Sequence, residues 1–161
     1  MEHKPSKTIV ETVEAYCQEK GIRFTEPRRM VLEAMAEARK PVGAYDILAQ
    51  MGKKVANPKP PTVYRAIDFL LEHQIIHRIE SLNAYILCQS DHSHNGSQFM
   101  ICDTCGSVSE AHLCDLPAAL SDKTREEGFQ LSRWNVELHG TCKACTTQQD
   151  RHAHVHCGCA H

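Results

Sequence analysis

Two Cys-x-x-Cys pairs are the residues of this chain whose types and spacing can do chemistry. Cys102 and Cys105 form the first pair, and Cys142 and Cys145 form the second. Four thiolates in this spacing complete a closed tetrahedral shell for zinc, whereas a lone pair could equally be a redox motif. Each pair ends an apolar, strand-like run, at 97–101 and at 134–138. We therefore expect a structural zinc site on a small sheet, with two disulfides or a redox pair as the alternatives.

The chain that must position these cysteines is short. Its 161 residues, with nine cysteines and eleven histidines, allow one ordinary domain or two small ones. Small domains bury little apolar surface and so have limited stability; we therefore expect bound zinc and dimerisation to stabilise them. The first residues show no apolar signal core, and no segment approaches membrane length. We therefore predict a cytoplasmic protein with reduced thiols rather than a secreted disulfide framework.

Charge and composition divide the chain into two functional parts. Residues 1–80 contain 13 Lys+Arg against 11 Asp+Glu, whereas residues 81–161 contain 5 against 9. The segment 89–96 has no apolar residue and ends in Asn-Gly, which is typical of a linker. The predicted organisation is a first domain at 1–88, a linker at 89–97, a second domain at 98–146 and a His/Cys-rich tail at 147–161.

The first domain has the pattern of helices followed by a hairpin. Segments 75–80 and 85–88 read as two strands joined by residues 81–84, and prolines around residue 60 fix the start of a fourth helix. This order of elements predicts a winged helix-turn-helix. The apolar residues at helical spacing are Ile9, Val13, Tyr16 and Cys17, then Val31, Ala34, Met35 and Ala38, then Ala44, Ile47, Leu48 and Met51, then Val63, Ala66, Ile67, Leu70 and Leu71.

In a winged helix-turn-helix the fourth helix enters the major groove of DNA with its first residues nearest the bases. Arg65 can contact guanine or a phosphate, and Tyr64 can stack or contact a backbone oxygen. Thr62 would cap the helix or contact a phosphate. An ordinary solvated face is the alternative for one isolated helix, but the helix order, the basic bias and the wing favour DNA. Nearby cations would contact phosphates or only aid solubility: Lys53, Lys54 and Lys59.

The second domain reads as a small sheet with a helix, so the fold class is α+β. Leu116, Ala119 and Leu120 give the helix a buried stripe, and apolar residues alternate with polar ones along 134–139. A sheet with one covering helix leaves an edge to protect. Pairing two such sheets across a two-fold axis would protect that edge, so we expect a homodimer.

Four strings, in this order and spacing, closely resemble the ferric uptake regulator (Fur) superfamily and, within it, its zinc uptake regulator (Zur) branch. They are GAYDIL at 43–48, KPPTVYRAIDFLLE at 59–72, QFMICDTCG at 98–106 and HGTCKAC at 139–145. The resemblance covers about residues 8–146. It implies a dimeric, metal-dependent transcriptional repressor with a winged helix and an α/β dimerisation domain, which binds a palindromic operator and controls zinc uptake genes.

The resemblance also implies a second, sensory zinc site. Its ligands would be His77 and Cys88 from the wing, a linker histidine and Glu110. One thiolate, one carboxylate and two imidazoles suit zinc better than the harder iron or manganese sites of the other branches. His94 is the linker ligand if a one-residue shift is assumed, with His92 and Asp91 as alternatives. Two Zn²⁺ ions per subunit are therefore expected.

Further predictions concern the remaining DNA-contacting residues, a third metal site and the tail. By resemblance, Tyr45 in GAYDIL reaches DNA from the third helix, and Arg28 contacts the DNA backbone although the neighbouring proline is shifted by one position. A third metal site would need residues that share only proximity in sequence: His112, Cys114 and His139. The tail 148–161 is rich in soft ligands and would act as a metal scavenger or as a solvated tail.

The predicted sensory site would let zinc binding control DNA binding. Ligands from the wing, the linker and the second domain reach one ion only if the hinge adopts one orientation, so zinc would favour the geometry that binds DNA. A zinc enzyme is the alternative class, but the sequence has neither His-Glu-x-x-His nor the deaminase signature, and we predict no enzymatic activity. A zinc-storage protein or metallochaperone would not need the recognition helix. An iron or peroxide sensor of the same superfamily is the closer competitor, against which Cys88 argues.

Overall fold

The computed structural model describes residues 6–38, 40–88, 96–111 and 117–147. It divides the chain into two units, Met1–Asp91 and His92–His161, with the division inside the segment predicted as a linker. In these described residues no helix has both the length and the apolar character needed to cross a membrane.

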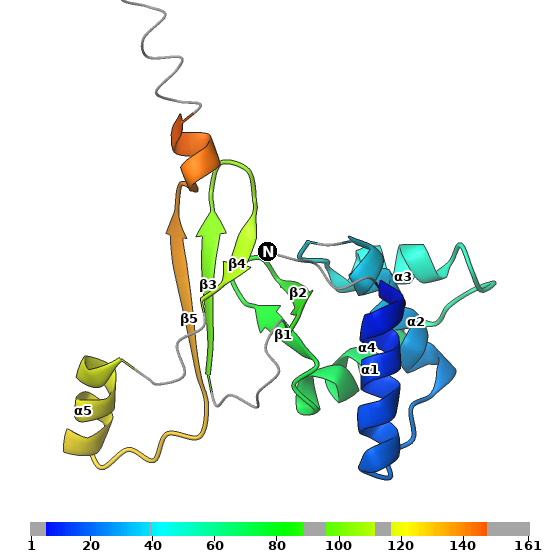
Figure 1. Cartoon of the computed structure of the whole chain (residues 1–161), viewed down its shortest axis with the longest axis horizontal. Coiled ribbons are helices and arrows are strands. Elements are labelled where there is room, and N and C mark those ends of the chain that lie inside the picture. The colour runs from blue at the N-terminus through cyan, green and yellow to red at the C-terminus, as the bar shows by residue number, and fades with distance from the viewer. Residues whose placement is uncertain (1–5, 39, 89–95, 112–116, 148–161) are drawn as a thin grey trace, which may run out of the picture. The chain divides into compact units, whose positions relative to one another are not determined.

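The first unit is a winged helix-turn-helix (Figure 1). Its last two elements are strands that form an antiparallel hairpin, with Ile76 opposite Leu87 and Ile79 opposite Ala84. Val42 adds a single bridge to Tyr85 of this hairpin. The predicted helices and hairpin are thus present, although Ala84 belongs to a strand rather than to the turn and Cys88 follows directly after that strand. In chain order the elements are α1 (Ser6–Glu19), α2 (Glu26–Ala38), α3 (Ala44–Met51), α4 (Pro60–Glu72), β1 (Ile76–Ile79) and β2 (Ala84–Leu87).

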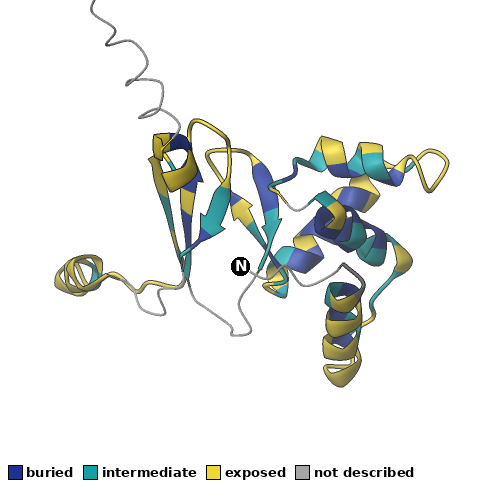
Figure 2. Cartoon of the chain, turned by 45° about the horizontal axis from the view of Figure 1, so that its top comes forward, coloured by how far each residue is buried: buried dark blue, intermediate teal, exposed yellow. Residues whose placement is uncertain are grey.

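One apolar core holds this unit together, with Leu32, Ile47 and Leu70 fully buried at its centre. Figure 2 shows that the buried faces of the helices turn towards one another. One predicted core position is wrong: Tyr16 is 36% exposed. The inner face of α1 is instead Val10, Val13 and Cys17, whose i, i+3, i+7 spacing leaves Tyr16 at the edge of the stripe.

Phe69 on α4 is a core residue that the predicted stripe omitted. Its side chain is 6% exposed, and its ring lies 4.4 Å from the His73 ring, centroid to centroid. The ring of Tyr16 contacts the same histidine edge-on at 6.2 Å. Aromatic pairs in these offset and edge arrangements are mutually attractive. The aromatic cluster therefore joins the end of α4 to α1.

The second unit is a three-stranded sheet followed along the chain by a helical turn at residues 143–147. Strand β3 (Gly96–Cys102) is central, antiparallel to β4 (Val108–Glu110) and parallel to β5 (Trp134–Gly140). A parallel pair needs a long crossover, which here contains α5 (Ala118–Glu126). Both units together confirm the α+β class.

The linker ends two residues earlier than predicted, because Gly96 and Ser97 belong to β3. Gly96 pairs with Trp134 on β5, and a Cβ atom placed on this glycine would lie 1.9 Å from the indole Cε2 atom. The residue that reads as a turn signal in the sequence is a strand glycine, since only glycine leaves room for the tryptophan.

The predicted buried stripe of the α5 region is not observed. Ala119 and Leu120 are exposed, Leu120 to 49%, and α5 has no buried residue. Leu116 lies outside the described residues. On the sheet, Met100 and Leu138 stand opposite each other and are 48% and 53% exposed. The helix therefore does not bury its apolar face against the sheet of its own chain.

Candidate metal centres and nucleic-acid interface

The four cysteines of the two Cys-x-x-Cys pairs gather at one end of the second unit. Cys102 ends β3, Cys105 lies in the turn before β4, and Cys142 and Cys145 follow β5. Their sulfur atoms all lie within 4.8 Å of one another. The Cys105 and Cys142 sulfurs are 3.8 Å apart, which matches the edge of about 3.8 Å in a tetrahedron with Zn–S bonds of about 2.3 Å. The predicted ligand set is thus assembled, and its size fits zinc.

Hydrogen bonds shape the first cysteine turn and join it to the end of β5 and to Cys142. The Gly106 amide donates to the Cys102 carbonyl at 2.8 Å, and Gly106 has φ +67°, a left-handed conformation that favours glycine. The Cys142 amide donates to the Cys102 sulfur at 3.2 Å. The ends of the two parallel strands are also joined, because the Asp103 amide donates to the Gly140 carbonyl at 2.8 Å. The fold therefore holds these sulfurs close without a disulfide in the described residues.

The cysteine thiols differ widely in acidity. The pKa of Cys102 is lowered to about 6, first by the hydrogen bond from the Cys142 amide and then by one from the Cys105 amide. The pKa of Cys145 is raised to about 12, mainly by hydrogen bonding to Cys142 and then to Cys105. Near neutral pH, Cys102 is therefore mostly a thiolate and Cys145 mostly a protonated thiol, so without metal the site carries only part of the charge of four thiolates. A bound dication favours the deprotonated form of all four ligands.

His139, at the end of β5, contacts Asp103 of the first cysteine turn. Its Nδ1 atom lies 3.0 Å from a carboxylate oxygen of Asp103, so the contact joins the end of β5 to the first cysteine turn. The possible third metal site paired His139 with His112 and Cys114, and these two lie outside the described residues. The contact with Asp103 had no signal in the sequence, because it depends on the parallel register of β3 and β5.

The wing of the first unit brings together a second group of candidate ligands. His77 on β1 stands opposite Ile86, and Cys88 follows β2 with its amide bonded to the Ile75 carbonyl at 3.0 Å. In this register the two residues are diagonal neighbours on one face of the hairpin. A ring nitrogen of His77 and the sulfur of Cys88 lie within 4.8 Å of each other. An imidazole and a thiolate at this distance can bind one zinc ion.

The other predicted sensory ligands lie elsewhere in the chain. Glu110 belongs to the second unit, where it ends β4, pairs with Phe99 and is buried. The linker candidates His94, His92 and Asp91 lie outside the described residues, as does the tail from residue 148.

Four of the five residues predicted to contact DNA are exposed. Tyr45 on α3 is 79% exposed, Tyr64 on α4 is 43% exposed, and Thr62 and Arg65 are also in the exposed class. Helix α4 begins at Pro60 with Lys59 as its N-cap, so Thr62 lies inside the first turn and does not cap the helix. These side chains are free of the core and available to a ligand outside the unit.

Two basic residues of the first unit are engaged within the protein. The guanidinium of Arg28 lies 3.5 Å above the centre of the Phe69 ring and donates a hydrogen bond to the Arg23 carbonyl. Arg28 was predicted to contact the DNA backbone; in the structure its guanidinium covers the core residue Phe69. Lys54 makes ion pairs with Glu33 and Glu37 on α2.

The fold and the clustered ligands define a winged-helix protein with a four-cysteine metal centre. The chain belongs to the ferric uptake regulator family, whose model matches residues 19–139. It is 36% identical over 146 residues to the zinc uptake regulation protein of Escherichia coli (strain K12), covering 90% of this chain and 85% of that protein.

Two solved structures are similar to this fold. A zinc uptake regulator complexed with zinc and DNA gives a TM-score of 0.84 at 35% identity, with 91% of this chain and 99% of that chain covered. The holo form of XcZur gives a TM-score of 0.78 at 37% identity, with 87% and 98% covered.

Proposed function

We propose that this protein is a zinc-responsive transcriptional repressor of the Zur branch, which binds a palindromic operator as a homodimer and controls zinc uptake genes. The observation that carries the proposal is the imidazole and thiolate pair of the wing, His77 and Cys88, within 4.8 Å of each other. A thiolate ligand favours zinc over the harder ions that other regulators of this kind sense. The similarity to a zinc uptake regulator solved with zinc and DNA supports the same function.

The two groups of ligands would have different roles. The four cysteines of the second unit form a closed set, since no position remains for a substrate or water, and closed thiolate sites are structural. The wing pair is an incomplete set in itself, and Glu110 with a linker residue, His94, His92 or Asp91, would complete it. We therefore assign two zinc ions per subunit, one structural and one regulatory.

The regulatory ligands would act through the hinge. Bound zinc would supply a Lewis acid to which ligands of the wing, the linker and the second unit could donate lone pairs. His77 and Cys88 would hold the wing and Glu110 would hold the second unit, so the linker would lose most of its orientations. Only a fraction of those orientations matches the spacing of two half-sites, and restricting the linker raises the apparent DNA affinity by the inverse of that fraction. A coupling of about 1–3 kcal/mol gives a response of roughly 5- to 150-fold.

The exposed residues of the first unit would read the operator. Tyr64 and Arg65 lie on the outer face of α4, Tyr45 on α3 would add a contact, and Thr62 would contact a phosphate. Arg28, which stacks on Phe69, would contact the backbone only with the edge of its guanidinium that the ring leaves free.

Apolar side chains of the second unit support dimer formation. Met100 and Leu138 form one cross-strand pair on an exposed face, and Leu120 and Phe129 add 49% and 62% exposed side chains. β5 is an edge strand of the sheet. A symmetric partner would cover both the apolar face and the edge. We also propose that the protein acts as a regulator rather than an enzyme and works in the cytoplasm, where thiols stay reduced.

The test is fluorescence anisotropy of a labelled palindromic operator with protein that already holds its structural zinc. Buffered free Zn²⁺, Fe²⁺ and Mn²⁺ are titrated separately. We expect zinc alone to switch binding on below micromolar concentration and a chelator to reverse it. Arg65→Ala is the control that should bind zinc and lose operator affinity, by about 1–3 kcal/mol for one good base contact. Equal activation by iron or manganese would assign the protein to another branch, and binding indifferent to every metal would refute the switch.

A further inference from the structure

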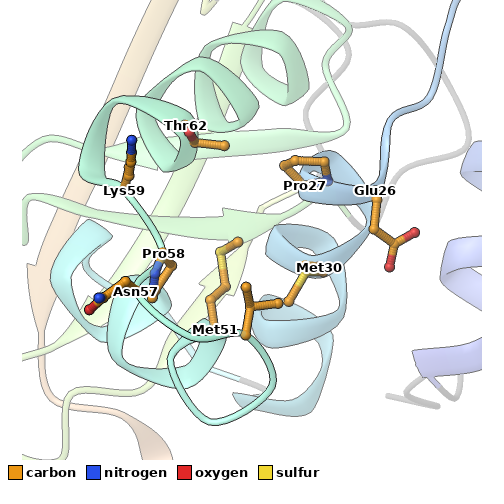
Figure 3. A pocket seen from close by; sticks show the side chains of 9 residues that line it. Glu26, Pro27, Met30, Met51, Asn57, Pro58, Lys59 and Thr62 are labelled. Atoms are coloured by element: carbon orange, nitrogen blue, oxygen red, sulfur yellow. The ribbon is translucent and has the colours of Figure 1, made fainter.

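The connection between α3 and α4, residues 52–59, carries little apolar packing of its own. Residues 52–57 are all exposed, and Val55, its only large apolar side chain, is 43% exposed. Figure 3 shows the hollow that remains between this connection and the start of α2, lined by Pro27 and Met30 on one side and by Pro58 and Lys59 on the other. Contacts other than apolar burial must therefore fix the connection.

Backbone hydrogen bonds join the first half of the connection to the end of α3. The Gly52 amide donates to the Leu48 carbonyl at 3.0 Å, and the Val55 amide donates to the Met51 carbonyl at 2.9 Å. Residues 52–55 therefore move with the end of α3, and whatever holds this turn also holds that helix. Helices α3 and α4 carry all the residues proposed to read the operator except Arg28.

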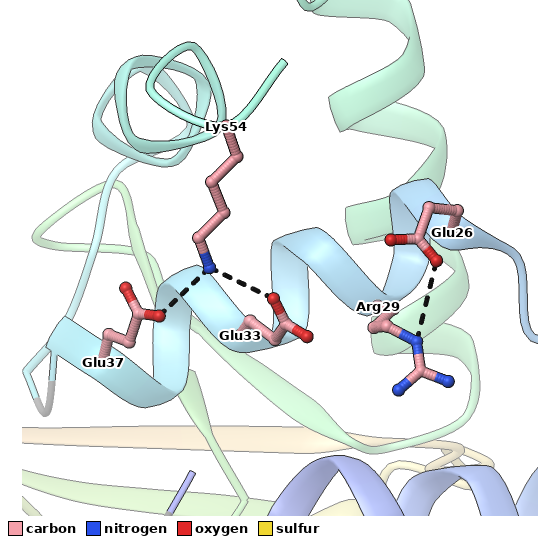
Figure 4. A network of polar contacts seen from close by, with 5 residues as sticks. All are labelled: Glu26, Arg29, Glu33, Glu37 and Lys54. Carbon is pink, nitrogen blue, oxygen red and sulfur yellow. Dashed lines mark hydrogen bonds and ion pairs between the residues drawn. The ribbon is translucent and has the colours of Figure 1, made fainter. Parts of the chain in front are cut away.

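Lys54 links this turn to α2 through two carboxylates. Its Nζ atom lies 3.2 Å from Glu33 Oε2 and 3.1 Å from Glu37 Oε1 (Figure 4). Glu33 and Glu37 are one helical turn apart, so they share a face of α2 and repel each other unless a cation lies between them. Hydrogen bonds to Glu37 and then to Glu33 raise the pKa of Lys54, so the ammonium stays charged.

We propose that Lys54 is a positioning residue for operator binding, which ties the end of α3 to α2 and so sets the place from which the chain enters α4. The proposal rests on the proposed function. One lysine shared by two glutamates carries a net charge of −1 as a group, so it is a poor phosphate site. Its neighbour Lys53 is likewise exposed and has the same formal charge, so it provides a matched comparison.

The first experiment compares Lys54→Ala with Lys53→Ala, two variants that remove the same charge from adjacent positions. Operator affinity is measured at saturating zinc over a series of salt concentrations. We expect Lys54→Ala to bind about three- to tenfold more weakly than Lys53→Ala, in line with two partly exposed ion pairs, and to keep the salt dependence of the wild type. Lys54→Arg, which can pair with both carboxylates, should restore the affinity. Equal losses in the two alanine variants, or a fall of about 0.9 in the log–log salt slope for Lys54→Ala, the mark of one lost phosphate contact, would overturn the proposal.

The second experiment separates positioning from simple electrostatics by the sign of the effect. Replacing both Glu33 and Glu37 by Gln removes two negative charges, which by charge alone strengthens DNA binding. If these carboxylates anchor Lys54, the double variant binds severalfold more weakly. Glu11 and Glu19 on α1, replaced together by Gln, give the matched change of charge away from Lys54. Stronger or unchanged binding by the Glu33 and Glu37 variant would contradict the anchor.

A measurement without DNA keeps this proposal separate from the proposed function. Amide hydrogen exchange of residues 52–55 should be severalfold faster in Lys54→Ala than in Lys53→Ala, because the turn loses its link to α2. Equal exchange would disprove the anchor even if the operator binds. Faster exchange with a wild-type protein that binds no operator would keep the anchor and refute the repressor function instead.

Discussion

The two candidate metal centres differ in how much of the chain each one needs. The four cysteines come from two turns of one unit, and their sulfurs already lie within 4.8 Å of one another. The wing pair supplies only His77 and Cys88, and residues of the linker and the second unit would complete the proposed site. A centre built within one unit can stabilise only that unit. A centre that draws on several segments binds metal best in one arrangement of those segments, and this differential affinity is what a switch requires.

Cys102→Ser should have the largest effect, because it removes a ligand of the proposed structural zinc. Structural zinc contributes apparent free energies of about 10–16 kcal/mol in small finger domains. We expect the second unit to lose its zinc and its fold, measured by metal content and by the fluorescence of Trp134, the single tryptophan of the chain, on β5. The helical signal of the first unit should remain. A folded second unit without tightly bound zinc would contradict the structural role.

Cys88→Ser should come next and separate the two centres. The variant should keep its fold, its dimer and its structural zinc, and lose the zinc-dependent gain in operator affinity, about 5- to 150-fold for a coupling of 1–3 kcal/mol. Anisotropy with buffered zinc measures this loss. Cys17→Ala is the control, because Cys17 is a buried thiol of α1 that is no proposed ligand. Normal zinc response in Cys88→Ser would remove the wing pair from the switch.

Glu110→Gln should have a smaller effect of the same kind. The amide keeps the size of the buried side chain but is a weaker zinc ligand than a carboxylate, so activation should need about tenfold more free zinc, a typical cost of losing one good interaction at a metal site. Glu127→Gln gives the control, an exposed carboxylate of the same unit. An unchanged zinc requirement would show that the second unit contributes no ligand through Glu110.

Deleting residues 148–161 should have the smallest effect. The tail follows the helical turn that carries Cys145, so its removal leaves all proposed ligands in place. We expect operator affinity at saturating zinc within twofold of the wild type, measured by the same anisotropy titration. A large loss of operator affinity would show that the tail takes part in the zinc switch. The regulatory centre would then need the tail as well as the wing, the linker and the second unit.

Local patterns in the sequence predicted the winged helix and the four-cysteine set well. The helical stripes around Ile47 and Leu70 bury their residues within one unit, so periodicity alone locates them. The two Cys-x-x-Cys pairs each form a turn at the end of a strand, and the spacing that defines the turn also defines the ligands.

Features that depend on contacts with a distant segment could not be predicted from local sequence patterns. The stripe at Ala119 and Leu120 is real as a pattern, but periodicity does not say which surface covers it, and the chain's own sheet does not. Gly96 reads as a turn because the pattern cannot show the indole of Trp134 against it. Lys54 reads as one more surface cation, because its glutamates are 17 and 21 residues away and only the packing of α2 brings them near.

The parallel pairing of β3 with β5 also sets the order in which the protein can mature. Cys142 lies 40 residues after Cys102, and β5 cannot join the sheet until the whole crossover has been made. At a synthesis rate of about 5–20 residues per second, the first cysteine pair leaves the ribosome seconds before the second. During that interval a nascent chain offers two thiols and an open strand edge. The four-cysteine site can therefore form only after residues 142–145 have left the ribosome.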